Sequence, residues 1–113
     1  MFKPARSENL FGETIVLDDV LDILSDERRR GMLYSMERED SDIFGYDELA
    51  EELIERGDLS PNQKDEFKTE ITHVHLPKLE DGGVIEHDHR SKTVRYVADE
   101  EVSEILDFLD AYE

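Results

Sequence analysis

A row of lysine and hydroxyl side chains in the middle of the chain has the spacing of a nucleic-acid contact surface. Within residues 61–80, four polar side chains recur at helical intervals and share one flank: Lys64, Lys68, Thr72 and His75, with Thr69 and His73 further round. Ammonium groups bind phosphate oxygens, and hydroxyls reach base edges in the major groove. The row therefore predicts a DNA-reading helix, although His75 is expected to be a half-buried hydrogen-bonding residue and not a DNA contact. The alternative is an ordinary solvated helix face, which the acids on the opposite flank favour: Asp65, Glu66 and Glu70.

A second basic group follows the row. Two β-branched runs on either side of the polar tip 88–92 predict a β-hairpin over residues 84–97. Its tip and second strand carry Arg90, Lys92 and Arg95, which would touch the DNA backbone or the minor groove. The alternative is that these charges protect an edge strand from pairing with other chains.

The densest basic run has a different interpretation. Arg28, Arg29 and Arg30 are consecutive, so on a helix their side chains spread over about 200° and cannot form one patch. We expect at most two of them to face DNA and one to pair with a nearby carboxylate such as Asp22 or Glu37. A structural role is favoured for this run.

Catalytic and metal chemistry have little support in the sequence. The chain has no cysteine, no nucleophile motif and no glycine-rich phosphate loop. His73 and His75 point apart on a helix, and a turn begins between His87 and His89, so a metal would need a further ligand from elsewhere. We expect no enzyme activity, no metal and no cofactor.

The net charge is strongly negative. The 113 residues include 31 acidic and 13 basic side chains, for a net charge of −18, and the acids are spread along every segment. An acidic disordered chain and an acidic mimic or partner protein are two interpretations. A third, a protein adapted to molar cytoplasmic salt, is favoured by that spread and by the scarcity of lysine.

The acidity is uneven along the chain. Residues 61–97 hold six basic and seven acidic side chains, for a net charge of −1, whereas the other 76 residues hold seven and 24, for a net charge of −17. Acids near phosphate would repel it, so a DNA-facing region needs this lower acidity. The asymmetry favours DNA contact by residues 61–97.

Helices and strands must position these residues, and their order is readable. A stripe of Leu17, Val20, Leu21 and Leu24 predicts a first helix, and Ser25 is the expected N-cap of a second helix that ends near residue 38. That second helix should turn three side chains inward: Met32, Leu33 and Met36. A short strand at 43–44 and a third helix at about 49–56, closed by Gly57, should follow.

The clearest local signal opens the fourth helix. Ser60, Pro61 and Gln63 form an N-cap, a first-turn proline and a capping box. We expect a kink, and no break, between His73 and Pro77, and a stop at the glycines 82–83. After the hairpin, a last helix should run from about residue 99.

This order predicts a mainly α fold with a small β-hairpin, that is, a winged helix-turn-helix domain with extra N- and C-terminal helices. The expected organisation is an N-terminal arm over residues 1–13, the winged helix-turn-helix domain over 14–98, and a terminal helix over 99–113.

Several segments resemble a known group of proteins. The segments "LDILSDERRRGMLYSM", "YDELAEEL", "THVHLPKLEDGGVIEHD" and "KTVRYV" resemble ArsR/MarR-like regulators, and especially a haloarchaeal winged-helix family of unassigned function. The resemblance spans Leu17 to Val97, and the segment from His73 to Leu79 is its most specific part. It implies a winged-helix fold and a regulatory role, but no ligand and no catalytic residue. The cysteine sites of the metal-sensing members have no counterpart in this chain.

The terminal helix suggests a dimer. Its apolar stripe is wider than one contact line covers, and we expect a homodimer interface built from Val102, Ile105, Leu106, Leu109 and Tyr112, with Phe108 beside them. The alternative is that this helix packs back on Leu17, Val20 and Leu24 of its own chain.

Together these features predict a cytoplasmic, DNA-binding transcriptional regulator. The alternative is a winged-helix module that binds protein and no DNA. No apolar run approaches the roughly 18 residues of a membrane span, so no membrane partner is expected.

Overall fold

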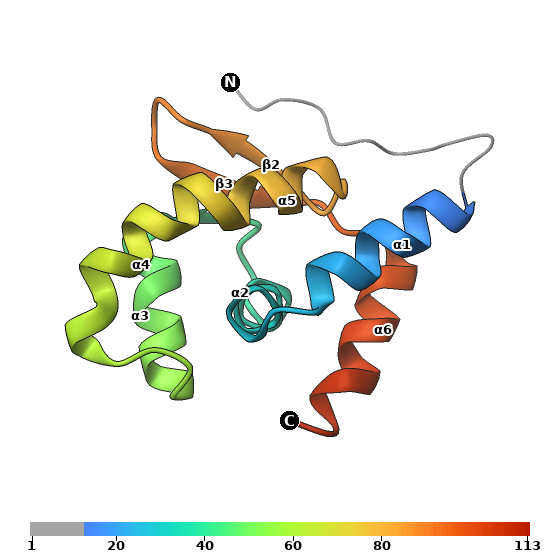
Figure 1. Cartoon of the computed structure of the whole chain (residues 1–113), viewed down its shortest axis with the longest axis horizontal. Helices are drawn as coiled ribbons and strands as arrows, with labels where there is room; N and C mark the ends of the chain where they lie inside the picture. Colours follow the sequence, from blue (N-terminus) through green and yellow to red (C-terminus); the bar gives the residue numbers. More distant parts are fainter. Residues whose placement is uncertain (1–12) are drawn as a thin grey trace.

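The computed structural model describes residues 13–113, which form a mainly helical fold with a small antiparallel sheet. In chain order the elements are α1 (Glu13–Leu24), α2 (Glu27–Arg38), β1 (Ile43–Gly45), α3 (Tyr46–Arg56), a 3-10 turn (Pro61–Gln63), α4 (Lys64–Glu70), a π-helical turn (Ile71–His75), α5 (Leu76–Asp81), β2 (Ile85–Asp88), β3 (Thr93–Tyr96) and α6 (Glu100–Asp110). Figure 1 shows the other elements arranged around α2, which is seen end-on. Within residues 13–113, no helix combines the length and apolarity needed to cross a membrane. The predicted arm falls outside this range except for Glu13, where α1 begins.

The sheet has three strands, with β3 between β1 and β2 and antiparallel to both. The predicted hairpin is therefore confirmed, and the predicted short strand is its third member. Phe44 of β1 lies opposite Val94 of β3, and both side chains are buried. The turn between β2 and β3 contains Lys92, whose φ of 56° is left-handed, a conformation that is costly for a residue other than glycine.

The predicted capped helix is present as one long helical run (Figure 1). It starts where expected, because the Ser60 backbone N–H donates to Gln63 Oε1 at 3.0 Å. The irregularity expected near Pro77 is the wider π turn over Ile71–His75, after which the helix continues as α5 without a break. It stops at the predicted glycines, where Gly83 takes a left-handed φ of 77° and Val84 N–H donates to the Leu79 carbonyl.

The core lies between α2 and the elements around it. Met32, Leu33 and Met36 point inward as predicted. They are joined by fully buried side chains from β1, α3, the long helical run, β2 and α6: Phe44, Leu49, Leu53, Phe67, Ile71, Leu76, Leu79, Ile85 and Leu106. Burial of this apolar surface is the main favourable contribution to folding. Because α4 and the hairpin both contribute side chains to this core, it fixes their positions relative to each other.

Two details at the start of the chain differ from the prediction. Asp26, not Ser25, caps α2, because Asp26 Oδ1 accepts from the backbone N–H groups of Arg28 and Arg29. The Ser25 hydroxyl instead donates to the Asp22 carbonyl, which holds Ser25 at the end of α1.

The buried face of α1 is also rotated relative to the predicted stripe. Leu21 is 55% exposed, and Ile23 is buried in its place. Ile23 meets Gly82 at the end of α5, where a Cβ would come within 2.1 Å of Ile23 Cδ1. Val20 and Leu24 are buried as predicted, and the side chain of Leu17 lies outside the described part.

Helix α6 packs against α2 of its own chain. Its N-cap is Asp99, whose Oδ1 accepts from Val102 N–H at 3.0 Å. Val102 and Leu106 are buried in the core, so little of their surface remains for a second copy. The other predicted interface residues, Ile105 and Leu109, are half-buried against the core, and Tyr112 is exposed.

Candidate functional site

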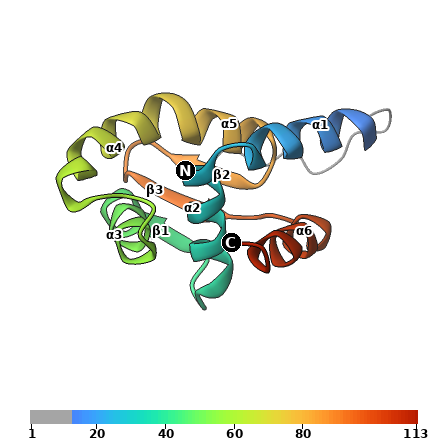
Figure 2. The same ribbon diagram turned by 60° about the horizontal axis from the view of Figure 1, so that its bottom comes forward.

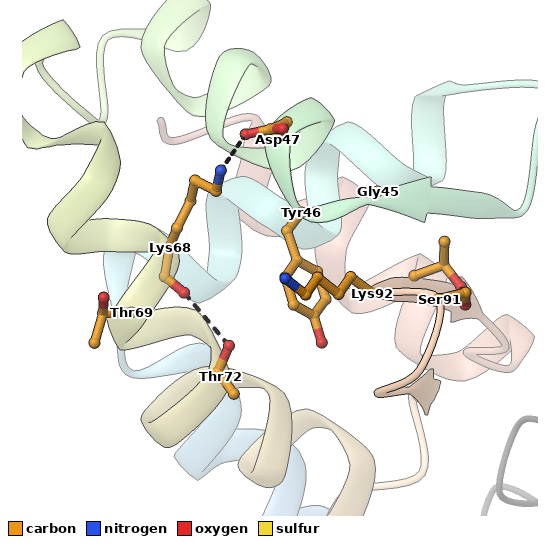
Figure 3. Close-up of a pocket in the computed structure, with 9 residues that line it drawn as sticks. Gly45, Tyr46, Asp47, Lys68, Thr69, Thr72, Ser91 and Lys92 are labelled. Carbon is orange, nitrogen blue, oxygen red and sulfur yellow. Dashed lines mark hydrogen bonds and ion pairs between the residues drawn. The ribbon is translucent and has the colours of Figure 1, made fainter.

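The best candidate site is a pocket between the long helix, the start of α3 and the β2–β3 turn (Figure 3). Its volume is about 500 Å³. Three segments of the chain line it: Gly45, Tyr46 and Asp47; Lys68, Thr69 and Thr72; and Ser91, Lys92 and Thr93. The lining is rich in hydroxyl groups and contains two lysines and one carboxylate, which suits a polar, anionic ligand.

Four of the eight residues predicted to bind DNA meet in this pocket. Lys68, Thr69 and Thr72 come from the long helix, and Lys92 comes from the β2–β3 turn. Figure 3 shows the Lys92 side chain extending from the turn towards α3 and α4. The left-handed backbone of Lys92 carries this side chain at a position where Gly or Asn would be less strained. Strain of this kind often marks functional positions.

The lysines of the long helix already have acidic partners. Lys68 Nζ lies 2.6 Å from Asp47 Oδ1, and Lys64 Nζ lies 2.7 Å from Glu51 Oε1 and 3.9 Å from Asp47 Oδ1. The hydrogen bond and the charge of Lys68 lower the pKa of Asp47, and Lys64 and Lys92 add to the effect. The hydrogen bond that Lys64 donates to Glu51 raises the pKa of Lys64. Any phosphate that binds here must compete with these carboxylates.

The remaining predicted DNA contacts are dispersed. Lys64 lies on the same helix as Lys68 but does not line the pocket, and His73 is exposed on the π turn. Arg90 is exposed in the β2–β3 turn, where its backbone N–H donates to Asp88 Oδ1. Arg95 forms an ion pair with the buried Glu86 on the neighbouring strand. The structure therefore concentrates the predicted site around Lys68 and Lys92.

A buried polar network holds the helix that carries Lys68, and its central residue is His75, which is hydrogen-bonded as predicted but fully and not half buried. The His75 side chain is only 1% exposed, with Nε2 2.6 Å from Glu70 Oε1 and Nδ1 3.3 Å from Arg29 Nη1. Arg29 can only donate, so Nδ1 accepts and we assign the proton to Nε2, which donates to Glu70. The π turn between Glu70 and His75 is the local irregularity that accompanies this pairing.

The arginine run belongs to the same support. Arg28 pairs with Glu70 at 2.7 Å, and Arg30 pairs with Glu113 at 2.7 Å. Arg29 donates to the backbone carbonyls of residues 22 and 23, so the expected partner Asp22 contributes its carbonyl and not its carboxylate. All three arginines form hydrogen bonds or ion pairs with other residues of the same chain, as the structural interpretation predicts. The other expected partner, Glu37, is not among the residues in these hydrogen bonds and ion pairs.

The hairpin histidines are packed together. The Tyr46 hydroxyl is hydrogen-bonded to His87 Nε2, and the rings of His87 and His89 are 3.9 Å apart between centroids. Burial, together with the charge of His89, lowers the pKa of His87 to about 4, against a smaller opposing effect of Asp88. Across residues 13–113, no three His, Asp or Glu side chains are grouped so that they could hold a metal ion.

Comparison with known proteins gives one match. The family model "Domain of unknown function (DUF7344)" matches residues 21–95, a range that contains every pocket-lining residue and ends before α6. The curated proteins and the solved structures contain no match to the chain.

Proposed function

The chain belongs to the DUF7344 family, and we propose that it is a DNA-binding transcriptional regulator of a halophilic archaeon. In this proposal the chain is a winged helix-turn-helix domain of the ArsR/MarR type. Helix 61–80 enters the major groove, α3 supports it, and the hairpin 84–97 is the wing.

The observation that carries the proposal is the meeting of Lys68, Thr69 and Thr72 with Lys92. These side chains come from the two elements that touch DNA in such a domain, and they converge on one pocket (Figure 3). Two lysines and several hydroxyls are the donors that bind phosphates and fix the position of a protein on a duplex.

The distribution of charge supports the same surface. Residues 61–97, which contain the helix and the hairpin, have a net charge of only −1 in a chain of net charge −18. Phosphate binding releases condensed cations only where the protein supplies positive charge. Elsewhere the acidic surface would repel the duplex and limit contact to this region.

A second candidate is a module that binds protein and no DNA. It is favoured by the pairing of Lys64 and Lys68 with Glu51 and Asp47, which leaves this face with less net positive charge than the lysines alone would give it. In that case the acidic surface would dock a basic partner. DNA affinity separates the two candidates.

The test is fluorescence anisotropy with labelled duplexes from 0.15 to 1 M KCl. Replacing both Lys68 and Lys92 with Glu should weaken binding at least about tenfold and lower the salt slope by about two, because each phosphate contact contributes roughly 0.9 to that slope. Far-UV circular dichroism checks that the variant is folded.

Lys78→Glu is the matched control. Lys78 lies on the same helical run and pairs with Asp22 at 2.8 Å, but it does not line the pocket. The Lys78→Glu variant should bind DNA far better than the variant with both Lys68 and Lys92 replaced. Equal affinity of the wild-type chain and the double variant would exclude this docking surface and favour the protein-binding module.

A further inference from the structure

The contact between Lys68 and Asp47 has an unusual combination of properties. The distance of 2.6 Å is short, yet the side chain of Asp47 is 68% exposed and that of Lys68 is 38% exposed. Exposed ion pairs contribute little net stability, because water competes for both partners. The Asp47 carboxylate is therefore a close but replaceable partner of the lysine.

A carboxylate and a phosphate present similar oxygens to a lysine. We propose that the pocket is a phosphate-binding site in which the Asp47 carboxylate holds Lys68 until a phosphate displaces it. The phosphate can belong to DNA, in which case the inference rests on the proposed function, or to a small phosphorylated compound.

The other pocket residues fit the exchange. Lys92 faces the pocket and its charge already acts on Asp47, so a second ammonium is in place for a group with more charge than one carboxylate. The hydroxyls of Thr69 and Thr72 make only long hydrogen bonds, each 3.4 Å, to backbone carbonyls of their own helix. Both hydroxyls can turn to a phosphate at little cost, since these bonds are weak.

The site also predicts a specific salt dependence. Once displaced, Asp47 stays beside the phosphate and repels it, and this repulsion is strongest at low ionic strength. Removing the charge of Asp47 should therefore strengthen phosphate binding most at low salt. At about 1 M salt the Debye length is roughly 3 Å, so the gain should become small.

The first arm of the experiment uses a labelled random-sequence duplex between 0.15 and 1 M KCl. Asp47→Asn should bind about 5- to 10-fold more tightly than the wild-type chain at the lowest salt, with the ratio falling towards one at the highest. Glu55→Gln is the matched control: it removes an exposed acid from the same helix, away from the pocket, and should leave affinity within about twofold of the wild type.

The second arm uses inorganic pyrophosphate at constant ionic strength, with the melting temperature as the readout. A ligand that binds only the folded chain raises this temperature. We expect a rise for the wild-type chain, a larger rise for Asp47→Asn, and no rise for Lys68→Gln. Lys92→Asn should also lose the rise, although Asn suits the left-handed backbone and preserves the fold.

The two arms of the experiment distinguish a failure of the proposed phosphate site from a failure of the proposed DNA-binding function. Tighter duplex binding by Asp47→Asn together with the pyrophosphate effect supports the site with DNA as the source of phosphate. A pyrophosphate effect without duplex binding by any variant supports the site for small phosphates and contradicts the proposed function. Duplex binding that depends on Lys68 and Lys92 but is unchanged in Asp47→Asn, with no pyrophosphate effect, overturns the site and leaves the function standing. If the chain binds no duplex and pyrophosphate does not raise its melting temperature, both the phosphate site and the proposed function are overturned.

Discussion

On the pocket side of the molecule, acidic side chains lie against basic ones, whereas at the contact between α2 and α6 some of them lie against one another, beside the ion pairs of Arg38 with Asp110 and Arg30 with Glu113. Lys68 binds Asp47, and Arg28 and His75 bind Glu70. On the other side, Glu37 of α2 faces Asp107 and Asp110 of α6. Figure 2 shows that α3 and α4 lie at the opposite end of the molecule from α6.

The pKa values follow this difference. Burial, together with the hydrogen bond and charge of Asp107, raises the pKa of Glu37 to about 7, against a smaller effect of Arg38. Burial also raises the pKa of Glu70, but hydrogen bonds from His75 and Arg28 outweigh it and leave that pKa below its usual value. In a chain with a net charge of −18, the local partners decide which carboxylates ionise.

The largest effect should come from removing the buried side chain that holds α6 against α2. Leu106 is fully buried, so Leu106→Ala should lower the free energy of unfolding by about 2–5 kcal/mol, through lost burial and a cavity. Urea unfolding measures the change.

Phe108→Ala is the control on the same helix. Phe108 is 64% exposed, so this change should cost less than about 0.5 kcal/mol in the monomer. Light scattering on both variants adds a test of the dimer. A dimer that Phe108→Ala dissociates would show that the exposed edge of α6 is an interface. A Leu106→Ala chain as stable as the wild type would contradict the packing of α6 on α2.

A smaller effect is expected on the pocket side. His75→Leu leaves Glu70 and Arg29 without their buried partner and should cost about 2–3 kcal/mol. His73→Leu changes an exposed residue of the same π turn and should stay within about 0.5 kcal/mol of the wild type. Equal stabilities for the two variants would show that the network does not hold the helix.

The smallest effect is a pH dependence with opposite signs on the two sides. The raised pKa of Glu37 stabilises the folded chain below pH 4.5, and this contribution is lost as the pH rises through about 7. Glu37→Gln should therefore match the wild type at pH 4.5 and exceed it by about 1 kcal/mol at pH 8, a figure reduced for solvent screening. Thermal unfolding between pH 4.5 and pH 8 measures the difference.

Glu70→Gln should show the reverse. The lowered pKa of Glu70 adds stability above its ordinary value of 4.5, and this is lost as the pH falls through the folded value. The variant should be less stable than the wild type at pH 7, with a deficit that shrinks on acidification. Parallel pH profiles for the two variants would show that the two sides do not differ in this way.

Much of the fold and part of the site were predictable because their signals are local. The capping group Ser60–Gln63, the glycine stops and the alternating β-branched runs act within a few residues, and each appears where expected. The same periodicity placed Lys68 and Thr72 on one helical flank, and the hairpin pattern placed Lys92 near the turn. Half of the predicted DNA contacts therefore meet in one pocket.

Local signals were insufficient where two partners of similar type compete. Ser25 and Asp26 both suit an N-cap, and only the backbone path between α1 and α2 selects Asp26. The apolar stripe of α6 fits a second copy or its own core equally well by pattern. The position of α2 beside it decides that Val102 and Leu106 pack inside the chain.

By itself, the sequence determined the order of the elements, several of their ends and the low acidity of residues 61–97, because capping, periodicity and composition depend on neighbours along the chain. Only the tertiary structure decided which charges meet. Arg29 reaches His75 across 46 positions, and Lys64 reaches Glu51 across 13, distances over which no helical or strand period relates two side chains. Asp47 opposes Lys68 for the same reason: core packing brings α3 beside α4 and places the carboxylate 2.6 Å from the lysine.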